Sequence, residues 1–309
     1  MQHFLDISGV EGSTLKSIIS DAMAMKSGTM AHDTVLAGKT IAMIFEKPST
    51  RTRVSFEVGI SQLGATPLML RGEETQMGRG ETIADTARVL SRFVDAIMIR
   101  TSSHTILTEL AEYATVPVIN GLTDKTHPCQ VMADTMTLAE KKAPGQDYTP
   151  FKVAWFGDGN NVAHSWIDAA AAFGFRLDLA VPPSFMPDQD VVTAAEAKGA
   201  QITITDDPAE AAHQADVMVT DTWSSMGIDK ATNSGEPEAV LAPYQVDEAL
   251  MAKASPDAIF MHCLPVYRGK EATAGVVDGP QSVIWDEAEN RLHVQKAIMA
   301  WCLRGGDKA

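Results

Sequence analysis

The sequence predicts an α/β protein of two domains, each a parallel sheet flanked by helices, and three observations support this. Short apolar runs alternate with segments of helical period along most of the chain. The stretch KKAPGQDYTPFK, residues 141–152, interrupts the alternation with two prolines and a glycine, and the alternation then restarts. The length of 309 residues suits two domains of ordinary size.

The first half of the chain contains four apolar runs short enough for buried strands. We expect these strands at residues 41–45, 67–70, 96–99 and 116–119. Helical segments lie between them, such as 52–63, which Gly64 ends, and 81–94.

The second half repeats this alternation after the break. We expect strands at residues 153–156, 177–181, 202–205, 217–220 and 258–262. Helices are expected at 161–173, 191–198 and 209–215, and an amphipathic helix at 287–303 closes the chain. The pattern predicts two α/β domains with helices crossing between them. In such sheets, ligands bind beyond the carboxyl ends of the strands.

Composition narrows the class of protein. Hydrophobic residues make up 45% and charged residues 21%, as in ordinary globular proteins. The net charge of -15 argues against nucleic acid as a partner, because phosphate backbones bind positive surfaces. No apolar run is long enough for a bilayer and no signal peptide is expected. The cysteines, Cys129, Cys263 and Cys302, cannot all pair, which favours a reducing, cytoplasmic compartment.

A candidate phosphate site follows the first strand, where the chain reads EKPSTRTR. Four polar residues stand at the start of the next helix: Ser49, Thr50, Arg51 and Thr52. Free backbone N–H groups and the helix dipole favour an anion there, and a guanidinium matches phosphate oxygens. A helix cap alone would explain one hydroxyl, but it poorly explains three hydroxyls together with two arginines, Arg51 and Arg53.

Two other strand ends of the first half carry donors. Arg100 follows strand 96–99 and is either solvated or directed at a ligand. His127 and Gln130 follow strand 116–119; a histidine can donate to a carbonyl and a glutamine amide can accept from an NH2 group. A lone histidine is usually a turn residue, but three strand ends that offer such groups indicate one binding site.

The second half offers a different chemistry. GDGNN follows strand 153–156 with two of the three glycines of a dinucleotide fingerprint, and Asn160 or Asn161 could cap the helix or hold a ligand. Asp221 ends strand 217–220, where a carboxylate can bind an ammonium group. Cys263 ends strand 258–262, and packing is the default role of such a thiol.

Four segments together resemble the motifs of ornithine carbamoyltransferases, in order and spacing, over essentially the whole chain. They are Ser49-Thr50-Arg51-Thr52-Arg53, His127-Pro128-Cys129-Gln130, Asp221 with Ser225-Met226-Gly227, and His262-Cys263-Leu264-Pro265. The first two are shared with aspartate carbamoyltransferases, and the last two indicate ornithine.

The resemblance implies transfer of a carbamoyl group from carbamoyl phosphate to the δ-amine of L-ornithine, giving L-citrulline and phosphate, in arginine biosynthesis or catabolism. It implies no cofactor, no metal and a homotrimer. It assigns carbamoyl phosphate to a domain of residues 1–141, completed by the C-terminal helix 287–309, and ornithine to a domain of residues 150–286.

The resemblance also assigns roles to individual residues. Carbamoyl phosphate would contact Ser49, Thr50, Arg51, Thr52, Gln76 from a neighbouring subunit, Arg100, His127, Gln130, Cys263, Leu264 and Arg291. Ornithine would contact Asn161, preferred over Asn160, and Asp221, Ser225 and Met226. The catalytic set would be Arg51, Arg100, His127, Asp221 and Cys263. Without the resemblance, Arg291 would be read as the ion-pair partner of Glu287, one helical turn earlier.

Other classes of protein remain to be weighed. A zinc enzyme could use His127, Cys129, His262 and Cys263, although neighbouring residues on a strand point to opposite faces. A nicotinamide dehydrogenase would rest on GDGNN alone, and a non-catalytic binding protein would not need intact motifs. Within the family, N-acetylornithine or putrescine could replace ornithine, whereas aspartate would require a cation at Asp221.

Overall fold

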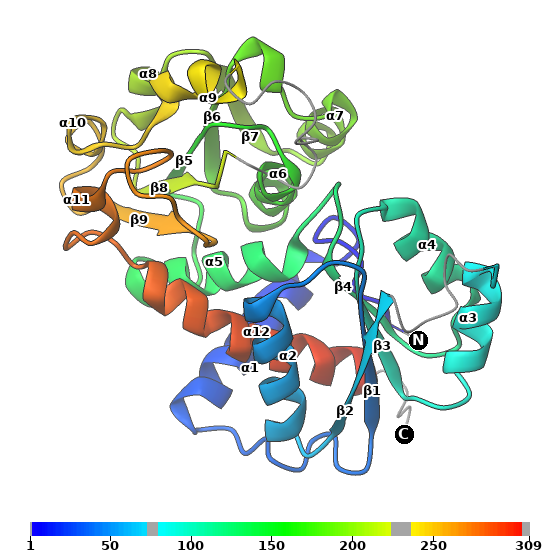
Figure 1. The fold of residues 1–309 in the computed structure, drawn as a ribbon. Helices are drawn as coiled ribbons and strands as arrows, with labels where there is room; N and C mark the ends of the chain where they lie inside the picture. Colours follow the sequence, from blue (N-terminus) through cyan, green and yellow to red (C-terminus); the bar gives the residue numbers. More distant parts are fainter. Residues whose placement is uncertain (1, 73–79, 224–235, 305–309) are drawn as a thin grey trace. The chain divides into compact units, whose positions relative to one another are not determined.

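The computed structural model describes residues 2–72, 80–223 and 236–304, drawn in Figure 1. The contacts within the chain divide it into two units, Met1–Ala133 with Asn290–Ala309 and Asp134–Glu289. The chain passes between the units inside α5 (Pro128–Lys141) and inside α12 (Ile284–Arg304). We expected the first boundary at residue 141, where the helix ends, but the division falls inside the helix.

The first unit contains a four-stranded parallel sheet with the order β2-β1-β3-β4. Its strands are β1 (Thr40–Phe45), β2 (Thr66–Arg71), β3 (Ala96–Arg100) and β4 (Val118–Leu122). The central strands are buried, whereas edge strand β2 alternates between exposed and half-buried residues. Near the N-terminus, Phe4 pairs with Ile119 and extends the sheet beyond β4.

Helices cover both faces of this sheet. The helices that begin in this unit are α1 (Gly12–Ser27), α2 (Thr50–Gln62), α3 (Ile83–Leu90) and α4 (His104–Tyr113). Ile44, Ile97 and Leu107 belong to a core between the sheet and the pair α3 and α4. On the other face, α12 lies beside α2 (Figure 1). The two helices approach closely at Gly59 of α2, where an added Cβ would lie 3.3 Å from the side chain of Lys296 in α12.

The second unit contains a five-stranded parallel sheet with the order β7-β6-β5-β8-β9. Its strands are β5 (Lys152–Phe156), β6 (Arg176–Ala180), β7 (Gln201–Thr205), β8 (Val217–Thr220) and β9 (Ile259–His262). Its helices are α6 (Asn161–Phe173), α7 (Gln189–Ala197), α8 (Pro208–Ala212), α9 (Glu236–Leu241), α10 (Glu248–Met251) and α11 (Ala274–Val277). A core around Met218 and Phe260 joins the sheet to α8, α10 and α11, and Figure 1 shows α6 and α7 on the opposite face.

The strand orders place a topological switch in each sheet, at β1 and β3 in the first and at β5 and β8 in the second. At a switch point the connections leave toward opposite faces, so a crevice opens at the carboxyl ends of the two strands. The polar residues that the sequence places at strand ends therefore stand at these two crevices.

The predicted fold class is confirmed, and most predicted elements are found within one or two residues. The predicted helix 81–94 is wrong at its end, because α3 stops at Leu90. The hydroxyl of Ser91 accepts a hydrogen bond from the N–H of Thr115 and donates one to the carbonyl of Ala87. Strand β4 begins at Val118 instead of residue 116, because Pro117 has no N–H for a sheet.

Strand β4 also continues through Asn120 and Gly121 to Leu122, although asparagine and glycine are poor strand formers. The N–H of Asn120 donates to the carbonyl of Phe4 at 2.8 Å, which ties the strand to the N-terminal segment. At Gly121 an added Cβ would lie 2.6 Å from the sulfur of Met98 and 3.1 Å from the carbonyl oxygen of Ile99, so a larger residue would require Met98 to move. No helix among the described residues is both long enough and apolar enough to cross a membrane.

Candidate active site

The residues of the predicted phosphate site stand at the start of α2. Ser49 is the N-cap residue, in an extended conformation, and within the described chain its side chain makes no capping hydrogen bond. Arg51 is exposed beside it. Arg53 points elsewhere and pairs with Glu57 at 3.3 Å on the surface of the helix. The helix start therefore presents backbone N–H groups, two hydroxyls and one guanidinium to the crevice.

Thr52 is the centre of the site in the first unit. Its fully buried hydroxyl oxygen accepts hydrogen bonds from Arg100 Nη1 at 3.1 Å and from Arg291 Nη2 at 2.8 Å. Arg100 comes from the end of β3, and Arg291 comes from α12, 239 residues further along the chain than Thr52. Two guanidiniums on one neutral oxygen form a local positive centre in a protein of net charge -15.

His127 is buried beside these two arginines, one residue before α5. Burial, and then the charges of Arg291 and Arg100, hold the pKa of His127 well below its ordinary value of 6.5. The imidazole is therefore neutral at physiological pH and can act as a hydrogen-bond donor without carrying charge. Gln130 is fully buried in the first turn of the same helix.

Cys129, in contrast, is buried and hydrogen-bonded to the backbone. Its sulfur donates to the carbonyl of Asn120 at 3.3 Å, and burial raises the pKa of the thiol to about 12. A protonated, buried thiol is a poor nucleophile and a poor metal ligand. We therefore interpret Cys129 as a packing residue.

Glu46 directly follows β1, close in sequence to the predicted phosphate residues, and sequence reasoning could not place it. Its Oε2 accepts from the hydroxyl of Thr101 at 2.5 Å and from the N–H of Ser102 at 3.3 Å. These bonds join the end of β1 to the segment after Arg100. Glu46 thus holds the strand ends together, while the half-buried Arg100 and the buried Arg291 meet at Thr52.

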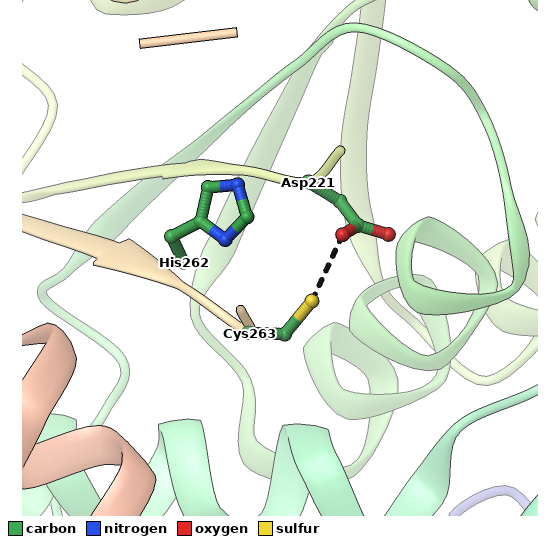
Figure 2. Close-up of side chains that lie close together, drawn as sticks. All are labelled: Asp221, His262 and Cys263. Carbon is green, nitrogen blue, oxygen red and sulfur yellow. Dashed lines mark hydrogen bonds between the residues drawn. The ribbon is translucent and has the colours of Figure 1, made fainter. Parts of the chain in front are cut away.

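Asp221 is the corresponding centre of the second unit, at the end of β8 (Figure 2). One carboxylate oxygen accepts from the thiol of Cys263 at 2.9 Å and from the N–H of Thr222 at 2.7 Å. The other accepts from the side-chain amide of Asn160 at 2.9 Å. This carboxylate is buried and oriented by three donors, which leaves it suited to hold a cationic group.

The two asparagines of GDGNN have different positions. Asn160 is the N-cap of α6: its Oδ1 accepts from the N–H groups of Val162 and Ala163, and its amide reaches Asp221. Asn161 is the first residue of α6 and is half-buried. The side chain of Asn160 is thus committed to the cap and to Asp221, which supports our preference for Asn161 as the ligand residue.

Two family descriptions match the chain. "Aspartate/ornithine carbamoyltransferase, carbamoyl-P binding domain" matches residues 2–140, and "Aspartate/ornithine carbamoyltransferase, Asp/Orn binding domain" matches residues 150–302. The chain belongs to this family.

Relatives within the family are close and cover the full chain. Ornithine carbamoyltransferase from Brucella ovis is 56% identical over 306 residues, which is 98% of this chain and 96% of the relative. The enzyme of that name from Agrobacterium fabrum is 55% identical over 98% of both chains. The structure of ornithine carbamoyltransferase from Pyrococcus furiosus superposes with a TM-score of 0.92 at 46% identity, covering 99% of this chain and 98% of that one.

The structure of this family member brings the predicted residues into two groups. Thr52, Arg100, His127 and Arg291 gather in the first unit, and Asn160, Asp221 and Cys263 gather in the second. Arg291 donates to Thr52, and the carboxylate of Glu287 accepts the N–H of His262. Gln76, Ser225 and Met226 lie outside the described residues.

The dinucleotide alternative fails at Gly159. In dinucleotide folds this second glycine lets the pyrophosphate approach the backbone. Here an added Cβ would lie 2.4 Å from the nitrogen of Pro187 and 2.6 Å from the carbonyl oxygen of Phe185, and the N–H of Gly159 donates to that carbonyl. The space is filled by the chain itself.

The zinc alternative needs one correction. We expected His262 and Cys263 to point to opposite faces of a strand, but β9 ends at His262, so Cys263 is free of that alternation. Potential ligand atoms of Asp221, His262 and Cys263 lie within 4.8 Å of one another. In this structure the three candidate ligands are engaged within the chain: the thiol of Cys263 donates to Asp221, and both ring nitrogens of His262 are hydrogen-bonded.

Proposed function

We infer that this chain transfers the carbamoyl group of carbamoyl phosphate to the δ-amine of L-ornithine, giving L-citrulline and phosphate. The close relatives named ornithine carbamoyltransferase support this reaction. The observation that carries it is the pair of opposite centres, with two guanidiniums at Thr52 and a buried carboxylate at Asp221. An acceptor such as aspartate would need a cation where Asp221 stands.

We propose that the first unit binds carbamoyl phosphate. Ser49, Thr50, Arg51 and Thr52 hold the phosphate at the start of α2. Arg100 and His127 direct donors at the carbonyl oxygen, Gln130 holds the carbamoyl amide, and Arg291 adds a further donor. Two observations support these roles: the two guanidiniums that meet at Thr52, and the lowered pKa of His127, which keeps its ring neutral. An oxyanion is stabilised by donors that are already oriented.

The domain boundaries that we propose remain those expected from the sequence, residues 1–141 with the C-terminal helix 287–309 for carbamoyl phosphate and 150–286 for ornithine. Arg291 supports the inclusion of the C-terminal helix, because it bonds Thr52.

The second unit holds ornithine in this proposal. Asn161, with Ser225 and Met226, binds the α-amino acid end, and Asp221 and Cys263 orient the δ-amine. Cys263 and Leu264 also contact the carbamoyl group. The three donors that fix the Asp221 carboxylate support its role as the site of the amine.

The chemical step requires a neutral amine. A δ-ammonium group with a pKa near that of lysine, about 10.4, has no lone pair at neutral pH and cannot attack. Once deprotonated, the nitrogen attacks the carbamoyl carbon, a tetrahedral intermediate forms, and the carbon–oxygen bond to phosphate breaks. The leaving phosphate takes the amine proton. No covalent intermediate with the chain and no cofactor is required.

We propose that the chain acts as a homotrimer, in which Gln76 reaches the site of a neighbouring subunit. The exposed face of the first unit supports this: Val54 and Val58 on α2 are 52% and 40% exposed, and Leu68 on edge strand β2 is 40% exposed. Val54 and Val58 also line a groove. Val58→Asp should give a monomeric mass by light scattering and should lose activity in a carbamoylation assay. A wild type that is monomeric and fully active would contradict the trimer.

We propose that the chain acts in the cytoplasm, in arginine biosynthesis or catabolism. A colorimetric ureido assay with ornithine, N-acetylornithine, putrescine and aspartate tests the acceptor directly. We expect ornithine to be strongly preferred. A preference for N-acetylornithine or putrescine would show that the proposed acceptor is wrong, while the proposed carbamoyl transfer would stand.

A further inference from the structure

A buried carboxylate and imidazole pair lies directly behind the proposed ornithine site, and the mechanism above does not use it. His262 and Glu271 are both fully buried, and His262 Nε2 lies 3.2 Å from Glu271 Oε1. The same oxygen accepts the backbone N–H of Tyr267 at 2.6 Å. Glu271 lies outside the four motifs and does not end a predicted strand, so the sequence patterns did not indicate it.

The hydrogen bonds of His262 determine which ring nitrogen carries the proton. Leu264 donates its backbone N–H to Nδ1 at 2.9 Å, so Nδ1 holds a lone pair. The proton of the neutral ring is therefore on Nε2, where it is donated to the carboxylate of Glu271. The backbone N–H of His262 itself donates to Glu287 at 2.8 Å, which fixes the end of β9.

This arrangement shapes the segment that follows β9. Leu264 has φ = 60°, in the left-handed region that residues with side chains avoid. Its N–H can reach Nδ1 only while that nitrogen is unprotonated. The turn at Leu264 in turn places the thiol of its neighbour Cys263 at 2.9 Å from Asp221 (Figure 2).

We propose that Glu271 is a positioning residue that acts through His262 to hold Leu264 in its left-handed turn and so aim Cys263 at Asp221. This inference rests on the proposed function, because it concerns the site at which that function places the δ-amine. Glu271 touches no substrate. Its carboxylate fixes the tautomer of His262, and His262 fixes the backbone.

A purely structural role would not require this pair. The second oxygen of Glu271, Oε2, has no hydrogen-bond partner among the described residues. Burying a carboxylate with an unmet oxygen is costly, and an apolar side chain of similar size would pack there more favourably. Polar groups in such positions serve to select one arrangement, here one ring orientation and one turn.

The test compares Glu271→Gln, Glu271→Leu and a control, Asp278→Asn. Glutamine keeps an oxygen for the bonds from His262 and Tyr267, and leucine removes both. Asp278 pairs with Arg268 at 2.7 Å on the surface beyond the same segment, so its substitution changes an exposed charge only. Three quantities are measured for each: the ornithine KM and kcat, the binding of a phosphonate analogue of carbamoyl phosphate, and the rate of alkylation of Cys263 by iodoacetamide.

We expect Glu271→Leu to raise the ornithine KM or lower kcat by about tenfold, the usual effect of removing a residue that orients a ligand-binding side chain. Alkylation of Cys263 should accelerate, because the thiol leaves Asp221. Analogue binding should weaken by less than the loss in ornithine kcat/KM, because the proposed phosphate contacts at the start of α2 are untouched. Glu271→Gln should restore most of the loss, and Asp278→Asn should match wild type.

Normal kinetics and normal alkylation in both Glu271 variants, with only thermal stability changed, would overturn the inference. If Glu271→Leu fails to fold, Glu271→Ala replaces it, because alanine also removes the acceptor of both bonds. The same change in KM or kcat and the same faster alkylation are then expected, and normal values of both would overturn the inference. A wild type that cannot carbamoylate ornithine would overturn the proposed function instead, and the alkylation rates would still decide whether Glu271 positions Cys263.

Discussion

The two units of the chain have the same architecture and opposite chemistry. Each is a parallel sheet with a switch point, and each gathers polar residues at the carboxyl ends of its strands. In the first unit these residues are donors, with Arg100 and Arg291 bonded to one hydroxyl of Thr52. In the second they surround an acceptor, the carboxylate of Asp221, which three donors hold in place.

The comparison shows that ligand chemistry is set by a few side chains at strand ends, while the sheets only determine where those ends meet. It also explains how a protein of net charge -15 can bind an anion: the local centre at Thr52 is cationic, and the excess of acidic residues lies elsewhere. Exchanging or removing charge in one unit should therefore affect one substrate and leave the other.

The largest effect is expected for Arg100→Met. Loss of this guanidinium should lower kcat/KM for carbamoyl phosphate by about 1000-fold, because it stabilises both the anion and the developing oxyanion. Steady-state kinetics measure this, with Arg53→Gln as the control, since Arg53 pairs with Glu57 on the exposed surface of α2. Equal losses in both variants would show that general surface charge matters and that the site at Thr52 does not.

Asp221→Asn should have a smaller effect and lower kcat/KM for ornithine by about 100-fold. The substitution removes the buried carboxylate that we propose to bind the ammonium group. Asp257→Asn is the control, since Asp257 lies on the surface with Lys142. If Asp221→Asn instead weakened carbamoyl phosphate and spared ornithine, the assignment of the two units would be reversed.

The pH dependence sharpens the assignment of the amine. The pKa of His127 lies well below 6.5, and that of the Cys263 thiol lies well above its ordinary value. Neither group changes charge between about pH 7 and 8.5, so kcat/KM for ornithine should rise about tenfold per pH unit there, as the δ-amine loses its proton. Ornithine analogues with a lower δ-amine pKa should shift this rise; a rise that stays fixed would indicate an enzyme group.

The smallest effect is expected for Thr52→Val, which keeps the shape of the side chain and removes the oxygen shared by Arg100 and Arg291. We expect a loss of about ten- to thirtyfold in kcat/KM for carbamoyl phosphate, since a hydrogen bond to a charged group contributes about 1.5–2 kcal/mol. Thr50→Val, at an exposed position two residues earlier, should cost less. A larger loss at Thr50 would move the centre of the site toward the surface of α2.

Much of this could be predicted from the sequence, because strands and helices leave periodic patterns and strand ends converge in a parallel sheet. The strand ends that carry Arg100 and Asp221 were found in this way. The position of Arg291 could not be predicted from periodicity, since it depends on how α12 folds back on α2, and the local pattern favoured a pair with Glu287. Glu271 was also missed, because a buried carboxylate that acts through a histidine has no local signature.

The most direct test of the two opposite centres is calorimetric titration of a phosphonate analogue of carbamoyl phosphate into the wild type, Arg291→Met and Asp221→Asn. The account predicts that Arg291→Met weakens binding by about 100-fold or more and that Asp221→Asn stays within about twofold of wild type. Normal binding in Arg291→Met, or a comparable loss in Asp221→Asn, would contradict the separation of anion and amine chemistry between the two units.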